Sequence, residues 1–312
     1  MTLVSIVIAA YNCEGYLAQT LQSACSHTLQ DFEVIVIDDG SKDGTRAVAE
    51  SFPDRRVRVF SQANQGQCAA SNAGCRFARG RYLKFLDADD LLNPQHLESQ
   101  LNSLSGTEEV LSCCTWGYFR TSLEGFSTFT EATDRDYDDP LEWLVDSLVR
   151  DQGMMGGCRW LIPRSVWDRC GGWNEKLSLN NDFDFSIRLL LAAQGVRFAP
   201  EAVYYYRKGV AGALSATASR SGQESAWLTT LLGTDSLLAR ENSPRIRRIC
   251  ADRFQEWLFR FYPEFPDLAA LCESRITQLG GSQRRLEGGR LLQLTLPWLG
   301  WRRIRRLQVL VR

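Results

Sequence analysis

The stretch FEVIVIDDGSKDGT, residues 32–45, decides the fold class of this chain. Residues 32–38 form an apolar, β-branched run that predicts a strand buried on both faces. Asp39, Gly40 and Ser41 then follow as turn formers, and residues 43–52 have the pattern of a helix. A buried strand that leads through a short turn into a helix is typical of α/β proteins with a parallel sheet.

The same alternation continues along the chain. Strands are predicted at 4–10, 57–60, 81–87, 158–164 and 203–207, short aromatic and threonine-rich strands within 110–130, and helices at 67–78, 138–149 and 182–193, with Pro94 opening another helix. Strands that are apolar on both faces and separated by helices indicate a parallel sheet covered on both sides. From residue 221 onward the pattern is helical, which predicts an α-helical appendage to an α/β core.

Composition and charge limit the kind of protein this can be. The chain has 312 residues, 44% of them hydrophobic, and a formal net charge of −1, so no global field favours nucleic acid as a partner. No apolar run reaches the roughly 18 residues that a membrane-spanning helix needs, and the N-terminus has the pattern of a first strand and not of a signal peptide. Ten cysteines without a CxxC pair, and two histidines, exclude zinc-type spacing and favour free thiols in a reducing cytoplasm.

Acidic residues gather where predicted strands end, which is where open α/β sheets bind ligands. FLDADD, residues 85–90, crowds three carboxylates that raise one another's pKa unless something offsets the repulsion. The alternatives are a solvated strand end with a helix cap, or a Mg²⁺ or Mn²⁺ site in which Asp87 and Asp89 point the same way and the metal bridges to substrate phosphates. For Asp38 and Asp39 the alternatives are a helix cap with its turn, or a carboxylate that binds a nucleotide.

Four motifs, in this order and spacing, resemble the family 2 glycosyltransferases with the GT-A fold. They are VSIVIAAYNCEGYL, FEVIVIDDGSKDGT, NQGQCAASNAGCRFARGRYLKFLDADD and NNDFDFSIRLLLAAQG, and they run from Val4 to Gly195. The resemblance implies an α/β fold with a mixed, mainly parallel sheet flanked by helices, a nucleotide-diphospho-sugar donor, a divalent metal and inversion at the anomeric carbon. It predicts a glycosyltransferase domain at 1–215, with a nucleotide-binding half (1–105) and an acceptor half (106–215), and a helical C-terminal region at 216–312.

Carried over residue by residue, the resemblance assigns the donor site. The residues that it places against the nucleotide or its phosphates are Ala9, Tyr11, Asn12, Asp39, Asn72, Asp87 and Arg207. An alanine stands at 9 or 10 where the family usually has proline, and Asp39 is the carboxylate expected to hold the base. Asn64, Gly66, Asn72 and Gly74 match the loop and helix beside the ribose. Asp89 is the expected ligand of Mn²⁺ or Mg²⁺, and Asp90 is an extra acid expected to act behind the site or as a cap.

Asp182 matches the general base of the family. Relatives often have Glu-Asp where this chain has Asn181-Asp182, which removes one negative charge beside the base but leaves the base itself. The alternative is that Asp182 is a helix cap, because it opens an amphipathic helix. Asp184 is the second choice for the base, although two steps along a helix it should point elsewhere.

Three further features have open interpretations. Arg207 and Lys208 begin a loop, RKGVAGALS, that could meet a diphosphate or form a solvated basic turn; a histidine common in relatives is absent at Gly209. Trp160 and Trp173 either shape the acceptor pocket or pack in the core. The C-terminal LPWLGWRRIRRLQVLVR, residues 296–312, combines tryptophan with arginine, which suits either an anionic membrane surface or a terminal helix packed on the body.

The predicted activity is transfer of a sugar from a nucleotide-diphospho-sugar, with a UDP-sugar favoured, to a hydroxyl of a saccharide or lipid-linked acceptor in bacterial polysaccharide, glycan or glycolipid synthesis. We expect a cytoplasmic protein that could touch the inner face of the cell membrane. One rival is a nucleotidyltransferase, which would need a Gly- and Arg/Lys-rich triphosphate loop that AAYNCEGYL lacks. Another is a non-catalytic module that binds sugar nucleotides, against which the complete set of aspartates argues.

Overall fold

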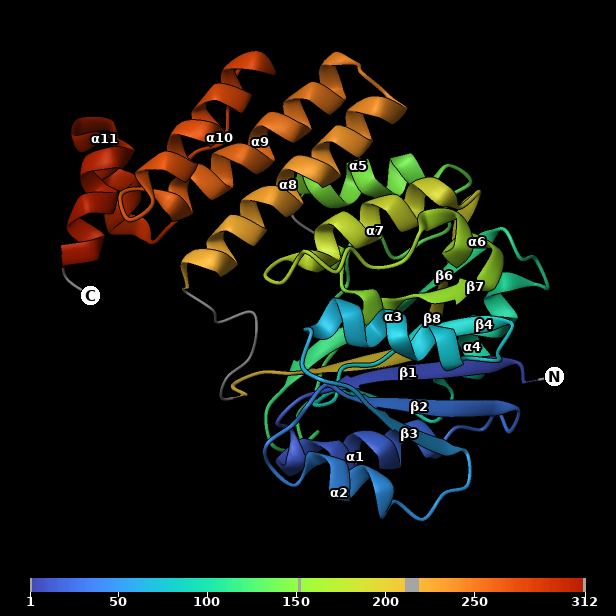
Figure 1. Ribbon diagram of the computed structural model, residues 1–312. Coiled ribbons are helices and arrows are strands. Elements are labelled where there is room, and N and C mark those ends of the chain that lie inside the picture. Colours follow the sequence, from blue (N-terminus) through green and yellow to red (C-terminus); the bar gives the residue numbers. More distant parts are fainter. Residues whose placement is uncertain (1, 151–152, 211–218, 311–312) are drawn as a thin grey trace. The chain divides into compact units, whose positions relative to one another are not determined.

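The computed structural model describes residues 2–150, 153–210 and 219–310, and the chain forms two compact units, Met1–Thr217 and Ala218–Arg312. The first unit is built on an eight-stranded sheet with the order β3-β2-β1-β4-β7-β6-β8-β5. In Figure 1, α1 and α2 lie on one face of this sheet, and α3, α5 and α7 lie on the other. The prediction of a mixed, mainly parallel sheet flanked by helices is therefore confirmed.

The first half of the sheet repeats a strand–helix unit. Its strands are β1 (Val4–Ala10), β2 (Phe32–Asp38), β3 (Val57–Ser61) and β4 (Tyr82–Phe85), joined by α1 (Glu14–Cys25), α2 (Thr45–Glu50) and α3 (Gln67–Phe77). All four strands are parallel, and every residue of β2 is buried, as its apolar run predicts. Helix α3 packs so closely on β1 that a Cβ at Gly74 would lie 2.3 Å from a Val7 methyl carbon. Glycine is therefore required at this contact.

The second half adds the strands β5 (Leu91–Leu92), β6 (Val110–Phe119), β7 (Leu161–Pro163) and β8 (Gly195–Arg207). Its helices are α4 (His96–Leu104), α5 (Pro140–Arg150), the short 3₁₀ helix η1 (Gly157–Arg159), α6 (Arg164–Cys170) and α7 (Asn181–Ala192). Strand β7 is antiparallel to both β4 and β6, and β6 is parallel to β8. The carboxyl ends of β1, β2, β4, β6 and β8 consequently share one edge of the sheet, where the predicted site residues gather.

Three local predictions were wrong, and one helix was missed. Pro94 does not open α4, which begins two residues later, because Pro94 lies in a turn in which His96 N donates to Asn93 O. Residues 110–119 form one long strand, because they pair continuously with β8 apart from one irregularity after Cys114. The strand predicted at 158–164 is shorter and follows η1. Helix α6 was not predicted, because its sequence, RSVWDRC, is too short to show a clear helical period.

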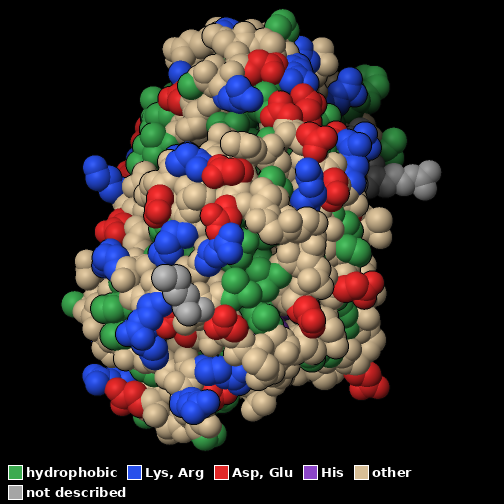
Figure 2. Space-filling view, turned by 90° about the vertical axis from the view of Figure 1, so that its right-hand side faces the viewer, with side chains coloured by type: hydrophobic (Ala, Val, Ile, Leu, Met, Phe, Trp, Pro, Cys, Tyr) green, Lys and Arg blue, Asp and Glu red, His purple; other side chains and the backbone are tan. Residues whose placement is uncertain are grey.

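The second unit consists of the helices α8 (Arg220–Arg240), α9 (Pro244–Phe261), α10 (Pro266–Gln278) and α11 (Arg290–Leu310). Helix α11 contains Pro297 and bends at Gly300, whose φ is 69°. Ile304 joins Phe259 and Leu286 in a small core, with Trp301 packed against it. None of the helices among the described residues is long and apolar enough to cross a membrane. Figure 2 shows acidic and basic side chains interspersed over one face of the molecule, in keeping with a net charge near zero.

Candidate active site

The acidic turn after β4 lies at the carboxyl edge of the sheet. Asp90 N donates to Asp87 O at 3.1 Å, which closes the turn, and Gln67 Nε2 donates to Asp87 Oδ1 at 2.9 Å. Burial, followed by the charges of Asp89 and Asp182, raises the pKa of Asp87 to about 7. Burial also raises the pKa of Asp89. The turn therefore holds negative charge at a cost, and a bound cation would relieve that cost.

Asp90 faces inward and braces the turn. It is buried, and it accepts hydrogen bonds from the Tyr204 hydroxyl and, at 2.6 Å, from Arg207 N. Burial is the first cause that raises the pKa of Asp90 well above its usual value, followed by the charges of Asp87 and Asp89. Both carboxylate oxygens of Asp90 are thus engaged by β8, as expected for an acid behind the site.

Arg207 is committed to the protein itself. Its guanidinium donates to Asp89 O at 2.6 Å, Arg120 O at 3.0 Å and Gln19 Oε1 at 2.7 Å, and the residue is 7% exposed. These bonds use three of the five N–H donors of the guanidinium and fix the side chain against the acidic turn. The structure thus gives Arg207 a bracing contact with the acidic turn, and its phosphate contact stays a prediction. Of the loop that follows, residues 211–215 lie outside the described residues.

Asp182 lies in the first turn of α7 and is held from outside the helix. The cap position is Asn180, with a φ of 64°, so the cap interpretation of Asp182 does not hold. Gly157 N, at the start of η1, donates to Asp182 Oδ1 at 2.8 Å. Burial raises the pKa of Asp182 to about 6, and the Gly157 N–H opposes that rise. Because the charge of Asp182 also raises the pKa of Asp87, the lone acid lies within electrostatic reach of the acidic turn.

The second candidate base, Asp184, is occupied elsewhere. Its Oδ2 pairs with Arg188 NH2 at 2.7 Å, and Arg188 also donates to the carbonyl oxygens of Cys170 and Gly172. This network secures the turn between α6 and α7. A carboxylate bound in such a network is not available to take a proton from a substrate, so Asp182 is the better candidate.

Gln67 connects the two acidic sites, and sequence reasoning missed it. Its amide donates to Asp87 Oδ1, and its Oε1 accepts from Asn181 Nδ2 at 3.3 Å. Asn181 also donates to Cys68 Sγ at 3.1 Å. A glutamate at 181 could not make these donations, which gives a physical reason for the asparagine in this chain. The available signal was the position of Gln67 at the start of a helix, directly after Gly66, which has a φ of 90°.

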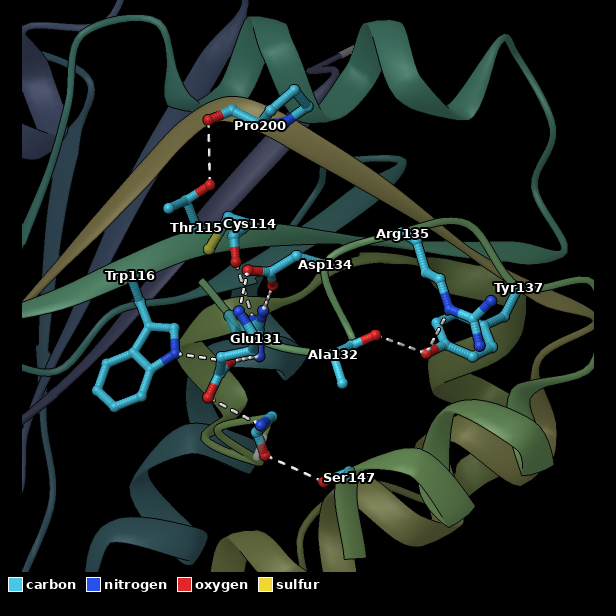
Figure 3. Close-up of polar contacts among 12 residues, drawn as sticks. Cys114, Thr115, Trp116, Glu131, Ala132, Asp134, Arg135, Tyr137, Ser147 and Pro200 are labelled. Atoms are coloured by element: carbon cyan, nitrogen blue, oxygen red, sulfur yellow. Dashed lines mark hydrogen bonds and ion pairs between the residues drawn. The ribbon is translucent and has the colours of Figure 1, made fainter. Parts of the chain in front are cut away.

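A buried polar network supports η1 from behind, and was also missed. Lys84 Nζ donates to Cys158 O at 2.6 Å, and Gln100 Nε2 donates to Arg159 O at 3.1 Å. The fully buried Arg159 side chain donates to Cys114 O at 2.9 Å and pairs with Glu131 at 2.7 Å and Asp134 at 2.6 Å. Figure 3 shows Glu131 beside the indole of Trp116, which donates to it at 2.9 Å. The network fixes the turn that presents Gly157 N to Asp182.

On the nucleotide side, the predicted residues share the carboxyl ends of β1 and β2. Tyr11 is 47% exposed, and Asn12, with a φ of 48°, accepts at Oδ1 from Lys42 N at 2.8 Å. Ala9 is half-buried and pairs with Ile37 in the sheet. Asp39 accepts from Gln62 Nε2, Gln65 N and Gly66 N at 2.8, 3.0 and 2.8 Å. Its two oxygens offer roughly four acceptor positions, so one remains for a nucleotide.

Asn72 and the two tryptophans have structural contacts. Asn72 Nδ2 donates to Trp173 O and to Glu175 Oε1, both at 2.9 Å, and Asn72 Oδ1 accepts from Trp173 N at 2.9 Å. Its amide therefore holds the loop before α7 and has little left for a ribose. Trp160 is fully buried against Trp143, and Trp173 stacks on Phe185 at 3.8 Å between ring centroids. Both tryptophans pack in the core, which leaves the acceptor pocket to other residues.

The comparisons with known proteins decide between the enzyme classes. Residues 5–159 match the family described as glycosyl transferase family 2. This part of the chain belongs to that family. An uncharacterized glycosyltransferase of Rickettsia typhi is 32% identical over 195 residues, which cover 60% of this chain and 58% of that protein. Chondroitin synthase of Escherichia coli is 32% identical over 192 residues, covering 60% of this chain and 26% of that protein. The chain thus spans little more than half the length of the first curated relatives it matches.

A solved structure shows the same fold. The crystal structure of Staphylococcus aureus TarS 1-349 in complex with UDP-GlcNAc superimposes with a TM-score of 0.64 at 16% identity, covering 90% of this chain and 93% of that one. The structure of the same protein with UDP also has a TM-score of 0.64, at 18% identity, covering 85% and 72%. The prediction of a GT-A fold is confirmed. The family match assigns a glycosyltransferase domain and removes the nucleotidyltransferase alternative.

Proposed function

We propose that this chain transfers a sugar from a nucleotide-diphospho-sugar, with a UDP-sugar favoured, to an acceptor hydroxyl with inversion at the anomeric carbon. The observation that carries the proposal is the half-buried Asp182 carboxylate, which accepts from Gly157 N and whose charge contributes to the raised pKa of Asp87. A pKa of about 6 suits a base that works near neutral pH. Tyr11, Asn12 and Asp39 at the ends of β1 and β2 would hold the base of the nucleotide.

The acidic turn fits a divalent metal. The described residues include no group of three His, Cys, Asp or Glu side chains that could hold an ion by themselves. Mg²⁺ and Mn²⁺ in phosphate-transfer sites commonly use one or two carboxylates together with substrate phosphate oxygens, so a complete protein cage is not needed. Asp89 is the proposed ligand. Arg207 donates to its main-chain carbonyl oxygen, which fixes the backbone, and the carboxylate itself is partly exposed. When bound, such an ion would stabilise the negative charge on the leaving diphosphate.

The step requires one base. Asp182 takes the proton of the acceptor hydroxyl while that oxygen forms a bond to the anomeric carbon on the face opposite the diphosphate. The bond from the anomeric carbon to the phosphate oxygen breaks, and its electron pair leaves with the nucleoside diphosphate. One displacement inverts the configuration. No covalent sugar–enzyme intermediate is formed, in contrast to retaining hydrolases with two adjacent carboxylates.

The experiment is a screen of nucleotide sugars for hydrolysis and transfer, with and without Mn²⁺, on the wild type and two variants. We expect Asp89→Ala and Asp182→Asn to lose turnover while keeping the fold, and Asp182→Asn to keep affinity for UDP. Asn can still accept from Gly157 N, so that variant isolates the loss of the base. Normal turnover by either variant would refute its assigned role. Tight binding of Mn²⁺ and UDP with no turnover of any donor would favour a non-catalytic module.

We also propose peripheral contact of the second unit with an anionic membrane surface at the cytoplasmic face. The two tryptophans of its last helix have different surroundings. Trp301 packs on Phe259 and Tyr262 at 5.1 and 5.3 Å between ring centroids, whereas Trp298 is 86% exposed. The exposed residues around Trp298 include both apolar and basic side chains: Leu294, Leu299, Arg302, Arg303, Arg306 and Leu307. An exposed tryptophan near several arginines suits an interface with anionic lipid.

A further inference from the structure

An aromatic cluster lies at the carboxyl edge of β6 and β8 and has no part in the site described above. Trp116 and Tyr118 project from β6 with ring centroids 5.0 Å apart. Phe129 lies 4.8 Å from Trp116 and 5.1 Å from Tyr118, and Tyr206 of β8 lies 5.6 Å from Tyr118. Tyr118 is 38% exposed and Phe129 40% exposed. We call these four residues the aromatic platform.

The platform is built before any ligand arrives. The indole N–H of Trp116 donates to Glu131 at 2.9 Å, and Phe129 N donates to Trp116 O at 2.9 Å. Glu131 is in turn paired with the fully buried Arg159 at 2.7 Å. Rings held in this way lose little conformational freedom when a ligand binds, which favours affinity. Tyr118 and Phe129 therefore present partly exposed rings on a rigid support, as a ligand-binding surface requires.

The platform lies on the same face of the sheet as the candidate catalytic acids. In the parallel β6–β8 pair, Trp116 is opposite Tyr204 and Tyr118 opposite Tyr206, so all four side chains share a face. The hydroxyl of Tyr204 donates to Asp90 of the acidic turn. Arg159, beneath Glu131, belongs to the same η1 turn as Gly157, which binds Asp182. The platform is thus linked to the acidic turn through the neighbouring Tyr204, and to the turn that binds Asp182 through Glu131 and Arg159.

We infer that the aromatic platform is the subsite that binds a pyranose ring of the acceptor, an inference that rests on the proposed function. The C–H face of a pyranose is weakly positive and suits the negative face of an aromatic ring. Ser127, Thr128 and Thr130 are exposed beside Phe129 and supply hydroxyl groups for the polar edge of a sugar. Lys208 Nζ lies 3.2 Å from the centroid of Tyr118, an exposed contact that a ligand can displace. The buried tryptophans of the core cannot serve this purpose.

Ligand-detected saturation-transfer NMR tests the inference with methyl glycosides of glucose, galactose, N-acetylglucosamine and glucuronic acid, in the presence of UDP and Mg²⁺, which is diamagnetic and leaves the ligand signals sharp. We expect at least one glycoside to bind the wild type, and Tyr118→Ala and Phe129→Ala to weaken its binding at least fivefold. Tyr118→Phe keeps the ring and should retain binding, whereas Phe129→Leu keeps only the apolar volume and should not. Phe77→Ala is the matched control, since Phe77 is 41% exposed but stacks on Phe60 of β3.

The outcomes separate the inference from the proposed function. Calorimetry with Mn²⁺ and UDP on the same samples reports whether each variant is folded and whether the chain binds a nucleotide at all. If UDP binds normally while no glycoside binds the wild type, or while the alanine variants bind glycosides as the wild type does, the platform is not the acceptor subsite. Retention of glycoside binding by Phe129→Leu would show that the aromatic ring is not required and would overturn the inference. Glycoside binding without UDP binding would contradict the proposed transferase and not the platform.

Discussion

At the residue scale, the proposed base depends on an opposition between burial and one hydrogen bond. Burial favours the neutral form of Asp182, and the N–H of Gly157 favours the ionised form, with a resulting pKa of about 6. A base works only when it is ionised. We therefore expect kcat for transfer to rise with pH and to level off above about pH 6. Initial rates with a UDP-sugar between about pH 4.5 and 8.5 test this, and a rate independent of pH over that range would contradict the assignment.

The residues differ in how well sequence could anticipate their roles. Asp89 and Asp182 follow from motif order, because an acid at a strand end and an acid opening a helix are visible in sequence. The partner of Asp182 is a main-chain N–H of Gly157, 25 positions away, and no side-chain pattern marks it. The amide of Asn72 and the guanidinium of Arg207 look like ligand-binding groups in sequence. In the structure both are engaged by main-chain groups that only the tertiary fold brings near.

Arg207 permits a direct test of its bracing contact. We expect Arg207→Met to lower the free energy of unfolding by about 1–3 kcal/mol, because the part-buried carbonyl oxygens of Asp89 and Arg120 lose their donors. Its exposed neighbour supplies the control, and Lys208→Met should change stability by less than about 0.5 kcal/mol. Urea unfolding without donor or metal provides the measurement. Wild-type stability of Arg207→Met combined with weaker UDP binding would contradict the bracing role and support the diphosphate contact predicted from sequence.

At the element scale, the repeated strand–helix units of the first half were predictable, because each strand is an uninterrupted apolar run between turn formers. The predicted bounds of β1 and β2 agree with the structure residue for residue. The second half was less predictable, since β7 has three residues, η1 has three and α6 has seven. Such short elements show no hydrophobic period, and tertiary contacts decide their conformation. The site depends on both halves, so sequence identified its acids but not their support.

The η1 turn affects the proposed base through the residues that hold it in place. Lys84 is fully buried, burial lowers its pKa to about 8, and its ammonium holds Cys158 O beside Gly157. We expect Lys84→Met to move the acid limb of the pH–rate profile upward. The variant removes a nearby positive charge and loosens the N–H that favours ionised Asp182, and both changes raise the pKa of that carboxyl. The KM for the donor should change little, since Lys84 lies behind η1.

The control for Lys84→Met is Lys176→Met, which removes an exposed ammonium from the segment between α6 and α7. This variant should leave the pH–rate profile where the wild type has it. Thermal unfolding of both variants shows how much of any loss in rate comes from loss of fold. If Lys84→Met lowers kcat equally at all pH values, the lysine stabilises the core and does not shift the pKa of Asp182.

At the scale of the whole molecule, the chain joins an enzyme domain of known family to a helical unit whose last helix leaves large apolar and basic side chains exposed. We expect the full chain to sediment with vesicles that contain phosphatidylglycerol and to be released as salt is raised, because arginine attraction to anionic lipid is screened over about 8–10 Å at physiological ionic strength. Trp298→Ala should weaken this binding several-fold, since an indole at the interface contributes through its buried apolar area.

The same unit supplies the control that makes this test decisive. Leu271 of α10 is 44% exposed and lies outside the Trp298 region in sequence, so Leu271→Ala removes exposed apolar area without touching the tryptophan–arginine segment. If Leu271→Ala reduces vesicle binding as much as Trp298→Ala does, the attraction is general hydrophobic adsorption. Equal binding to uncharged phosphatidylcholine vesicles would likewise remove any role for the arginines. Loss confined to Trp298→Ala, with strong salt dependence, would place the transferase domain beside a lipid surface where a lipid-linked acceptor is available.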